Sequence, residues 1–322
     1  MVRKKFKIQK TEIRLKIIKR RRVAALFIIG ILSVGIISIA LFKEKEEVVV
    51  AEEKLKREKS EEIKKKEFEN NQKDIEKEQI YLSLKDDPFA DDAKKVEKDL
   101  KDLITGKRNF PIRTDGKKVA YLTFDDGPSN TVTPEILKIL KEENIKGTFF
   151  VLGSKVNESE ENKELVKKIA KNGHALANHT YSHDYRKLYP KGEIKADYFL
   201  EEVRKTNRLL KDILGESFDT RVVRFPGGYW SWNGREEARK KLDEAGICSV
   251  DWNALNGDAE GVKISASNLN KRLKESFYEL GDKADNIVVL MHDTNGKETT
   301  AESLRETINF LKKKGFEFRT IK

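Results

Sequence analysis

Hydrophobic and polar positions alternate regularly from about residue 117 to the end of the chain. Short apolar runs rich in β-branched and aromatic residues predict strands, and the amphipathic stretches between them predict helices. The predicted strands are Val119–Phe124, Thr148–Leu152, Ala175–Asn178, Val222–Phe225, Ile247–Asp251, Ile287–His292 and Phe316–Ile321. The predicted helices are Pro134–Glu143, Lys163–Lys171, Ile194–Leu214, Glu236–Ala245, Ala266–Leu280 and Glu302–Lys314. Seven such alternations predict an α/β fold with a parallel sheet.

The polar residues at the strand ends help to choose between an open sheet and a closed barrel. Each set falls at or just beyond the C-terminal end of a different predicted strand: Asp125 and Asp126, His179 and His183, Arg224, Asp258, and His292. Side chains from so many strands can meet at one mouth only if the sheet curls round. We therefore expect a (β/α) barrel of about seven parallel strands.

The N-terminal part of the chain has a different pattern. Val23–Phe42 is a run of twenty residues without charge, and as a helix it would be about 30 Å long, enough to cross a bilayer. The basic block Lys19–Arg22 predicts that residues 1–22 form a cytoplasmic tail and that the bulk of the chain lies outside the cell. The alternative is a signal peptide cleaved after Ala40. We expect an uncleaved single-pass anchor in the cell membrane, because the run is longer than an ordinary signal peptide's apolar segment.

The net charge of +11 belongs to this tail. Residues 1–22 carry eleven Lys or Arg and one acidic residue, so the remainder, with 55 basic and 54 acidic residues, is nearly neutral. A nucleic-acid partner is therefore not expected. Residues 43–116 are predicted to be a stalk and linker. Residues 43–79 are densely charged and form either a solvated helix or a partly disordered segment, 90–105 is predicted as a further helix, and self-association of the stalk stays open. The main domain is predicted to span 117–322. Its one cysteine, Cys248, lies in an apolar run typical of a buried side chain.

Two segments carry the candidate chemistry. Asp125 and Asp126 follow an apolar strand directly, and such adjacent carboxylates repel unless they share a cation or a proton. His179 and His183 are four residues apart, so on a helical turn both rings would face the same way. Two imidazoles and one carboxylate make a three-ligand metal site with room for water, and the second carboxylate would serve as a general base. The residues themselves therefore indicate a metal-dependent hydrolase.

Five segments, in order, resemble the motifs of the polysaccharide deacetylases, carbohydrate esterase family four. They are Thr123–Gly127, His179–His183, Arg224–Pro226, Asp251–Asp258 and Leu290–His292. The resemblance covers residues 119–292 and implies a distorted (β/α) barrel that removes N-acetyl groups from sugar polymers. Neither the anchor nor the stalk takes part in it.

Carried over position by position, the resemblance implies distinct roles. Asp126, His179 and His183 become the metal ligands, and Asp125 becomes the general base. Arg224 orients Asp125, His292 is the general acid, and Asp258 tunes His292. The implied cofactor is one divalent ion, zinc first, with cobalt, nickel and manganese as alternatives.

The chain departs from the family pattern beside the expected substrate groove. Gly227 and Gly228 stand where relatives usually have an aromatic residue after the proline, and Ala259 stands where they often have Trp. Substitute aromatic surfaces are available nearby. The residues expected to contact substrate are Pro226, Gly227, Tyr229, Trp230, Trp252 and Leu290, with the Gly227 N–H as an oxyanion donor and Trp232 as a further aromatic candidate.

We therefore expect a membrane-anchored, extracellular deacetylase of N-acetylglucosamine units in peptidoglycan. Asp126 argues against the branch of the family that acts on N-acetylmuramic acid, which tends to have Asn there. The alternatives are another polymer (poly-N-acetylglucosamine, chitin oligomers or acetylxylan) or a non-catalytic wall-binding protein.

Overall fold

The computed structural model describes residues 81–261 and 263–322, which belong to one compact unit, Glu78–Lys322. The predicted tail 1–22, the predicted membrane span Val23–Phe42 and most of the predicted stalk lie outside these residues. Among the residues that are described, none of the helices combines the length and apolar character needed to cross a bilayer.

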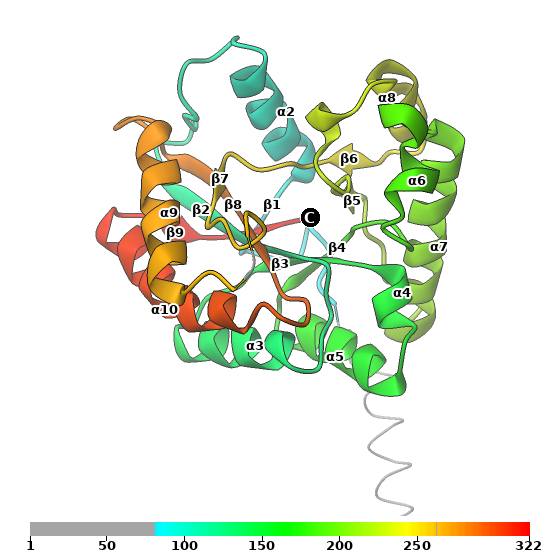
Figure 1. The fold of residues 1–322 in the computed structure, drawn as a ribbon, viewed down its shortest axis with the longest axis horizontal. Helices are drawn as coiled ribbons and strands as arrows, with labels where there is room; N and C mark the ends of the chain where they lie inside the picture. The colour runs from blue at the N-terminus through cyan, green and yellow to red at the C-terminus, as the bar shows by residue number, and fades with distance from the viewer. Residues whose placement is uncertain (1–80, 262) are drawn as a thin grey trace, which may run out of the picture. The chain divides into compact units, whose positions relative to one another are not determined.

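A curled parallel sheet forms the centre of the domain (Figure 1). Seven strands are hydrogen-bonded in the order β6-β5-β4-β3-β2-β8-β7, and β9 pairs with β2 outside this path. The strands are β2 Val119–Asp125, β3 Thr148–Val151, β4 Ala175–Asn178, β5 Val222–Val223, β6 Cys248–Ser249, β7 Ala254–Leu255, β8 Asn286–His292 and β9 Glu317–Phe318. The curled arrangement agrees with the predicted distorted barrel.

Alternation along β2 separates two cores. Ala120, Leu122 and Phe124 point outward into the larger cluster beneath the helices. Val119 and Tyr121 belong instead to the cluster inside the curl. Every residue of β2 is buried, as expected for a parallel strand covered on both faces. Because side chains alternate, Asp125 continues the inward-facing row and is delivered to the C-terminal mouth of the curl.

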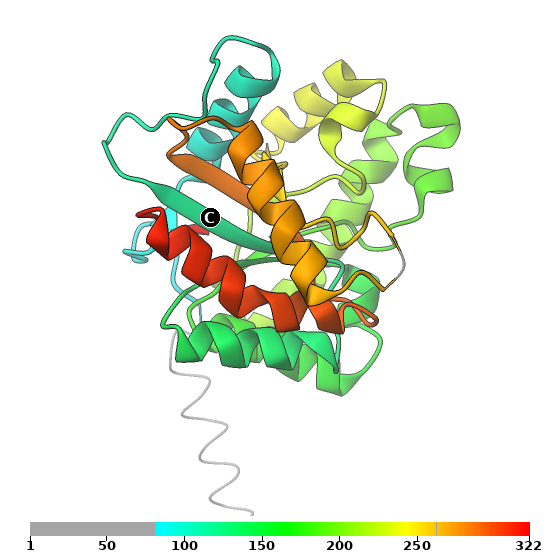
Figure 2. The same cartoon turned by 60° about the vertical axis from the view of Figure 1, so that its left-hand side comes forward.

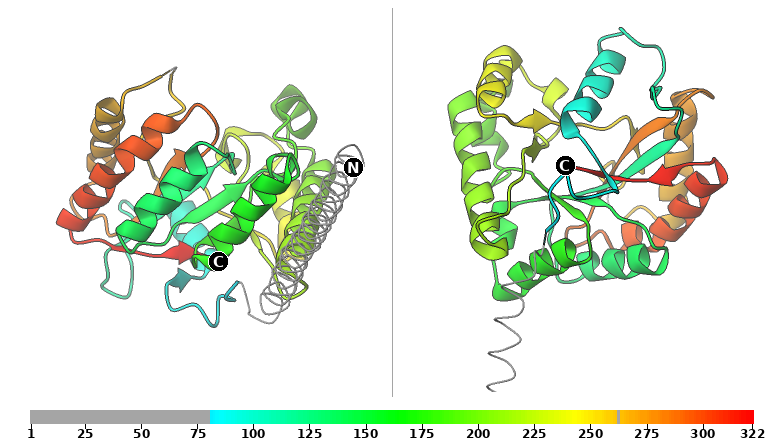
Figure 3. Two further views of the ribbon diagram at one scale, coloured as in Figure 1. Left: turned by 90° about the horizontal axis from the view of Figure 1, so that it is seen from below. Right: turned by 180° about the vertical axis from the view of Figure 1, so that it is seen from behind.

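Residues 81–116 belong to the same compact unit. Helix α2 (Ala93–Ile104) begins after Asp92, whose side chain accepts the N–H of Lys94 as an N-cap. Its apolar stripe, Ala93, Val96 and Leu100, enters the inner cluster, and α2 lies on the open side between β6 and β7 (Figures 1 and 3). A short pair, β1 (Ala90–Asp91) with β10 (Thr320–Ile321), joins this segment to the C-terminus. The helix thus fills the gap that the sheet leaves open.

The remaining helices cover the outer face of the sheet (Figures 1 and 2). Helices α9 and α10 lie side by side, and α10 also packs on α3. The bounds are α3 Val132–Glu142, α4 Gly153–Val156, α5 Glu160–Lys171, α6 Tyr185–Leu188, α7 Ala196–Leu214, α8 Arg235–Glu244, α9 Ala266–Glu279 and α10 Glu298–Lys313, with 3₁₀ turns η1 Pro190–Gly192 and η2 Tyr229–Ser231.

The predicted elements differ from the observed ones in three ways. Strand β7 was not predicted, because its two residues carry too little pattern to be recognised. The predicted strand Phe316–Ile321 is divided into β9 and β10, so it does not add a single strand to the main path. The predicted strands ending at Phe225 and Asp251 are also shorter, because the chain leaves the sheet to form the site loops.

Candidate metal centre and active site

Two adjacent carboxylates leave the sheet in different directions. Asp125 is the last residue of β2 and is 2% exposed. Asp126 has a positive φ of 69°, which turns the chain sharply out of the strand. A side chain at Gly127 would lie 2.3 Å from the carboxylate of Asp293, so only glycine fits the next position. The local backbone therefore separates the two carboxylates into distinct environments.

Asp125 is held by a buried arginine. The fully buried Arg224 donates from one terminal nitrogen to Asp125 Oδ1 at 2.7 Å and to Thr123 Oγ1 at 2.8 Å. Its other N–H groups donate to the carbonyls of Val250 and Asp251 at 2.9 and 3.0 Å. The guanidinium is thereby fixed, and one oxygen of Asp125 is committed to it. The other carboxylate oxygen, Oδ2, faces the histidines and lies 3.8 Å from His179 Nε2.

The two histidines do not lie on a helical turn, so that prediction is wrong. They occupy an irregular loop after β4, with positive φ values of 69° at Thr180 and 55° at His183. Asn178 accepts the N–H of Thr180. The buried carboxylate of Glu202 in α7 accepts the N–H groups of the next two residues, at 3.2 and 2.6 Å. These contacts from outside the segment fix a loop that brings both rings to the same place.

Asp126, His179 and His183 form a cluster that fits a divalent ion. Asp126 Oδ1 lies 3.4 Å from His179 Nε2 and 3.3 Å from His183 Nε2, and it is buried without a hydrogen-bond partner among the described residues. Ligands about 2.0–2.1 Å from a tetrahedral metal are about 3.3 Å apart, so the spacing matches. His179 Nδ1 lies 2.8 Å from the carbonyl of Arg224, which leaves Nε2 free for a metal.

Protonation in this cluster is coupled. Burial raises the pKa of Asp126, but the close contact with His179 and the charges of the neighbouring histidines outweigh burial and hold the pKa far below its usual value. Burial lowers the pKa of His179, but Asp125 and Asp126 outweigh it and raise the pKa overall. Burial and the neighbouring His179 lower the pKa of His183. Ligation by both rings therefore requires release of the His179 proton, so metal affinity should weaken at low pH.

His292 lies on the other side of the cluster. It ends β8, paired in register with Asp125 of β2. Its Nδ1 lies 2.7 Å from Asp258 Oδ1, and its Nε2 lies 4.0 Å from Asp126 Oδ2. Burial lowers the pKa of His292, but the hydrogen bond and charge of Asp258 outweigh it and raise the pKa to about 9. The ring is therefore an imidazolium at neutral pH with Nε2 directed to the metal cluster.

The loop after Arg224 places the predicted substrate contacts. Pro226 is buried, and its carbonyl accepts the indole N–H of Trp232 at 2.9 Å. Gly227 has a φ of +76°, and within the described part of the chain its N–H has no acceptor. Trp252 packs against Gly228 and lies 5.6 Å from the Arg224 guanidinium, while Leu290 is 9% exposed in β8. Only some of the predicted contacts therefore offer surface to a ligand.

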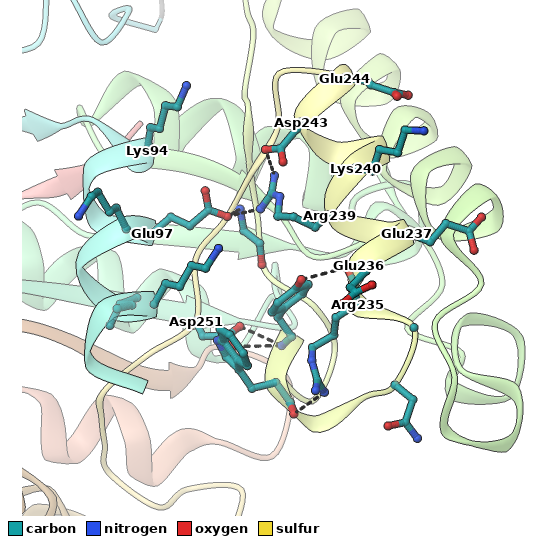
Figure 4. A pocket seen from close by; sticks show the side chains of 18 residues that line it. Lys94, Glu97, Arg235, Glu236, Glu237, Arg239, Lys240, Asp243, Glu244 and Asp251 are labelled. Carbon is teal, nitrogen blue, oxygen red and sulfur yellow. Dashed lines mark hydrogen bonds and ion pairs between the residues drawn. The ribbon is translucent and has the colours of Figure 1, made fainter. Parts of the chain in front are cut away.

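Tyr229 and Trp230 face a groove between α2 and α8 (Figure 4). Its volume is about 1330 Å³, and Asp251 also lines it. The Tyr229 hydroxyl donates to the carbonyl of Arg235, and the Trp230 ring packs edge-on against Tyr229. The groove is bridged by the ion pair of Glu97 with Arg239. The two aromatic residues therefore line a groove whose walls do not include Asp126, His179 or His183.

Four further residues shape the site and were not singled out by sequence reasoning. Glu202 orders the histidine loop, and Asp251 accepts the N–H of Tyr229 at 3.0 Å. Asp293 is buried against the Asp125 loop, where burial raises its pKa to about 7. Tyr185 lies beside His183, with ring centroids 5.1 Å apart. Two of these residues could have been recognised from the sequence. Asp293 directly follows His292, and Asp251 begins the fourth motif.

Comparison with known proteins agrees with this geometry. Residues 112–245 match the family model for polysaccharide deacetylase. A peptidoglycan-N-acetylglucosamine deacetylase of Bacillus cereus is 34% identical over 66% of this chain and 72% of its own length. The enzyme of the same name from Listeria monocytogenes, PgdA, is 33% identical over 78% of this chain, which spans 50% of that protein.

A solved structure shows the same fold. A Streptococcus mutans CE4 esterase superposes with a TM-score of 0.64 and 34% identity, covering 73% of this chain and 92% of that one. The five motifs had predicted this membership, and it is confirmed. The chain belongs to the polysaccharide deacetylase family, carbohydrate esterase family four.

Proposed function

We propose that this protein is a metal-dependent hydrolase that removes N-acetyl groups from N-acetylglucosamine residues of peptidoglycan at the outer face of the membrane. One observation carries the chemistry. An Asp-His-His cluster with metal-ligand spacing lies between a carboxylate held by a buried arginine and an imidazolium held by a buried carboxylate. The proposed base and acid therefore both border one metal site, at the ends of the neighbouring strands β2 and β8.

The residues that would hold the ion are Asp126, His179 and His183. A divalent ion bound there supplies Lewis acidity, which lowers the pKa of a water molecule and polarises an acetyl carbonyl. Zinc suits one carboxylate and two imidazoles, and cobalt, nickel and manganese are accepted by the same donor set.

Asp125 is the proposed general base. Arg224 occupies its Oδ1, so Oδ2 is the oxygen available to take a proton from the attacking water. The arrangement also restricts rotation of the carboxylate, because Arg224 is itself held by two carbonyl groups. A base with one fixed orientation loses little entropy when it meets its proton.

His292 is the proposed general acid. Its raised pKa keeps it protonated at neutral pH, and Asp258 fixes Nδ1 so that Nε2 is the nitrogen that can release a proton to the leaving amine. The developing oxyanion needs a further donor. The N–H of Gly227 is the proposed one, because it has no acceptor among the described residues and belongs to the loop that follows Arg224.

The substrate and location are inferred from the relatives and the sequence. The relatives from Bacillus cereus and Listeria monocytogenes are both peptidoglycan-N-acetylglucosamine deacetylases by name. An anchor at Val23–Phe42 and a charged stalk would keep the domain near the cell wall. Asp126, rather than Asn, favours N-acetylglucosamine over N-acetylmuramic acid.

Mass spectrometry of muropeptides tests the proposal. Purified full-length protein incubated with peptidoglycan should produce muropeptides that have lost one acetyl group, and fragmentation should place the loss on N-acetylglucosamine. The Asp125→Asn variant is the matched control. Loss from N-acetylmuramic acid would overturn the assigned sugar. No loss from peptidoglycan, with acetate released from another acetylated polymer, would overturn the assigned substrate.

A further inference from the structure

Gly227 lies in a space already filled by two aromatic side chains. A Cβ atom at this position would lie 3.0 Å from Trp232 Cζ2 and 3.2 Å from the hydroxyl oxygen of Tyr185. The structure thus places rings from two other segments in the volume beside Gly227.

These two rings belong to a cluster of contacting aromatic rings that reaches from Tyr189 to His183 of the metal cluster. Trp232 stacks on the buried Tyr189, with centroids 4.1 Å apart and planes at 16°, and its indole N–H donates to the carbonyl of Pro226. Tyr185 leans on Trp232, with centroids 5.4 Å apart, and on His183, with centroids 5.1 Å apart. The inner rings are fixed, so they hold the outer ring in one place.

Tyr185 is the exposed ring of this aromatic cluster. It is 44% exposed, one of four exposed Phe, Tyr or Trp side chains among the described residues, and none of the described residues hydrogen-bonds its hydroxyl. An exposed ring held rigidly beside a metal ligand is poorly explained by packing alone, because the core beneath it is already filled. It is suited to a ligand that has an apolar face and a polar edge.

We propose that Tyr185, supported by Trp232, forms a stacking subsite for a sugar ring of the substrate beside the metal centre. A pyranose ring presents C–H groups on its faces and hydroxyls around its edge, so it can lie on the tyrosine ring while its hydroxyls stay accessible to polar groups. This inference rests on the proposed function, because it takes an N-acetylated glycan as the ligand.

The test compares a substrate that has sugar rings with one that has none. The full-length protein and its Tyr185→Leu variant are assayed on an N-acetylglucosamine pentamer and on an activated acetate ester without a sugar. The ratio of kcat/KM for the pentamer to that for the ester should fall about tenfold, mainly through KM, the size expected for loss of one aromatic contact. Tyr185→Phe, which keeps the ring, should retain at least about half of the ratio.

Tyr278→Leu is the matched control, because Tyr278 is a 55% exposed tyrosine on α9 outside the site. Its ratio should equal that of the unsubstituted protein. A ratio for Tyr185→Leu that matches the control would overturn the subsite, as would equal losses on both substrates. Thermal unfolding of each variant shows whether the fold is retained.

Binding measurements separate the subsite from the function. Calorimetric titration of the pentamer into Asp125→Asn protein, with and without Tyr185→Leu, should show about tenfold weaker binding in the double variant. If the unsubstituted protein releases no acetate but this difference is found, the proposed function fails and the subsite stands. If acetate is released but binding does not depend on Tyr185, the subsite fails and the function stands.

Discussion

Replacing Asp258 with Asn should shift the pH dependence of catalysis, because it removes one charge from a buried pair. Asp258 is 5% exposed, and its Oδ1 lies 2.7 Å from His292 Nδ1. Its Oδ2 accepts the main-chain N–H of His292 at 2.8 Å and the hydroxyl of Thr300 at 2.7 Å. Asparagine has nearly the same shape, so the variant changes charge and leaves the surrounding packing in place.

The magnitude follows from the pKa of His292. Burial lowers this pKa, but the hydrogen bond and charge of Asp258, with smaller contributions from Asp125 and Asp126, raise it from 6.5 to about 9. At about 1.4 kcal/mol per pKa unit, the difference corresponds to about 3 kcal/mol in favour of the imidazolium. Asp258 contributes the largest part of the increase, so Asp258→Asn should lower the pKa of His292 by at least about one unit.

The assay is kcat/KM against pH on an acetylated glucosamine oligomer. His292 must be protonated to act as an acid, so activity falls as pH rises through its pKa, and the alkaline limb should move to lower pH in the variant. The acidic limb, set by Asp125 or the attacking water, should stay in place. Thr300→Ser is the control, because it keeps a hydroxyl and the Asp258 charge. A variant profile that superimposes on the original after scaling would refute the reasoning.

The same pair affects stability with a defined sign. Because the folded-state pKa of His292 is raised, its contribution to the free energy of unfolding is fully present below pH 6.5 and is lost as pH rises through about 9. Asp258→Asn should therefore reduce stability most near pH 6 and least above the folded-state pKa. Chemical denaturation at both pH values measures the difference.

Three further outcomes are expected. His179→Ala should lose the metal and most activity, whereas Asp125→Asn should keep the metal and still lose activity; metal analysis that finds both variants empty would show that the two roles are not separate. Gly227→Ala should lower the free energy of unfolding by about 1–2 kcal/mol, because its φ of +76° and the tryptophan ring 3.0 Å away leave no room for a methyl group; an unchanged denaturation midpoint would contradict this. The segment Val23–Phe42 should remain on the mature protein; N-terminal sequencing of membrane-derived protein that begins at Leu41 would contradict the anchor.

Most of the strands along the chain and the residue types of the candidate site could be predicted from the sequence. Buried parallel strands are apolar along their whole length, as in Val119–Phe124, and a run of this kind is visible without any tertiary information. The polar residues that interrupt the pattern, such as Asp125 and His292, fall at strand ends. The carboxyl ends of parallel strands share one edge, so their convergence followed from the pattern.

Short elements and loop conformations could not be predicted in the same way. Strand β7 has two residues, which gives no period to detect. The spacing of His179 and His183 is that of a helical turn, but the loop's N–H groups are bonded by Glu202, which lies about twenty residues further on in α7. A local pattern cannot reveal a hydrogen-bond acceptor that reaches a loop only after α7 has packed.

The sequence by itself determined the family, the fold class and the candidate residues for metal binding and acid–base chemistry, because those depend on local periodicity and on which chemical groups are present. The tertiary structure decided which oxygen of Asp125 is free. It also brought Tyr185 and Trp232 to the side of Gly227 where a side chain would otherwise lie. Such arrangements depend on contacts between segments far apart in the chain. Many loop conformations are compatible with one local sequence, and burial and hydrogen bonding between distant segments select among them.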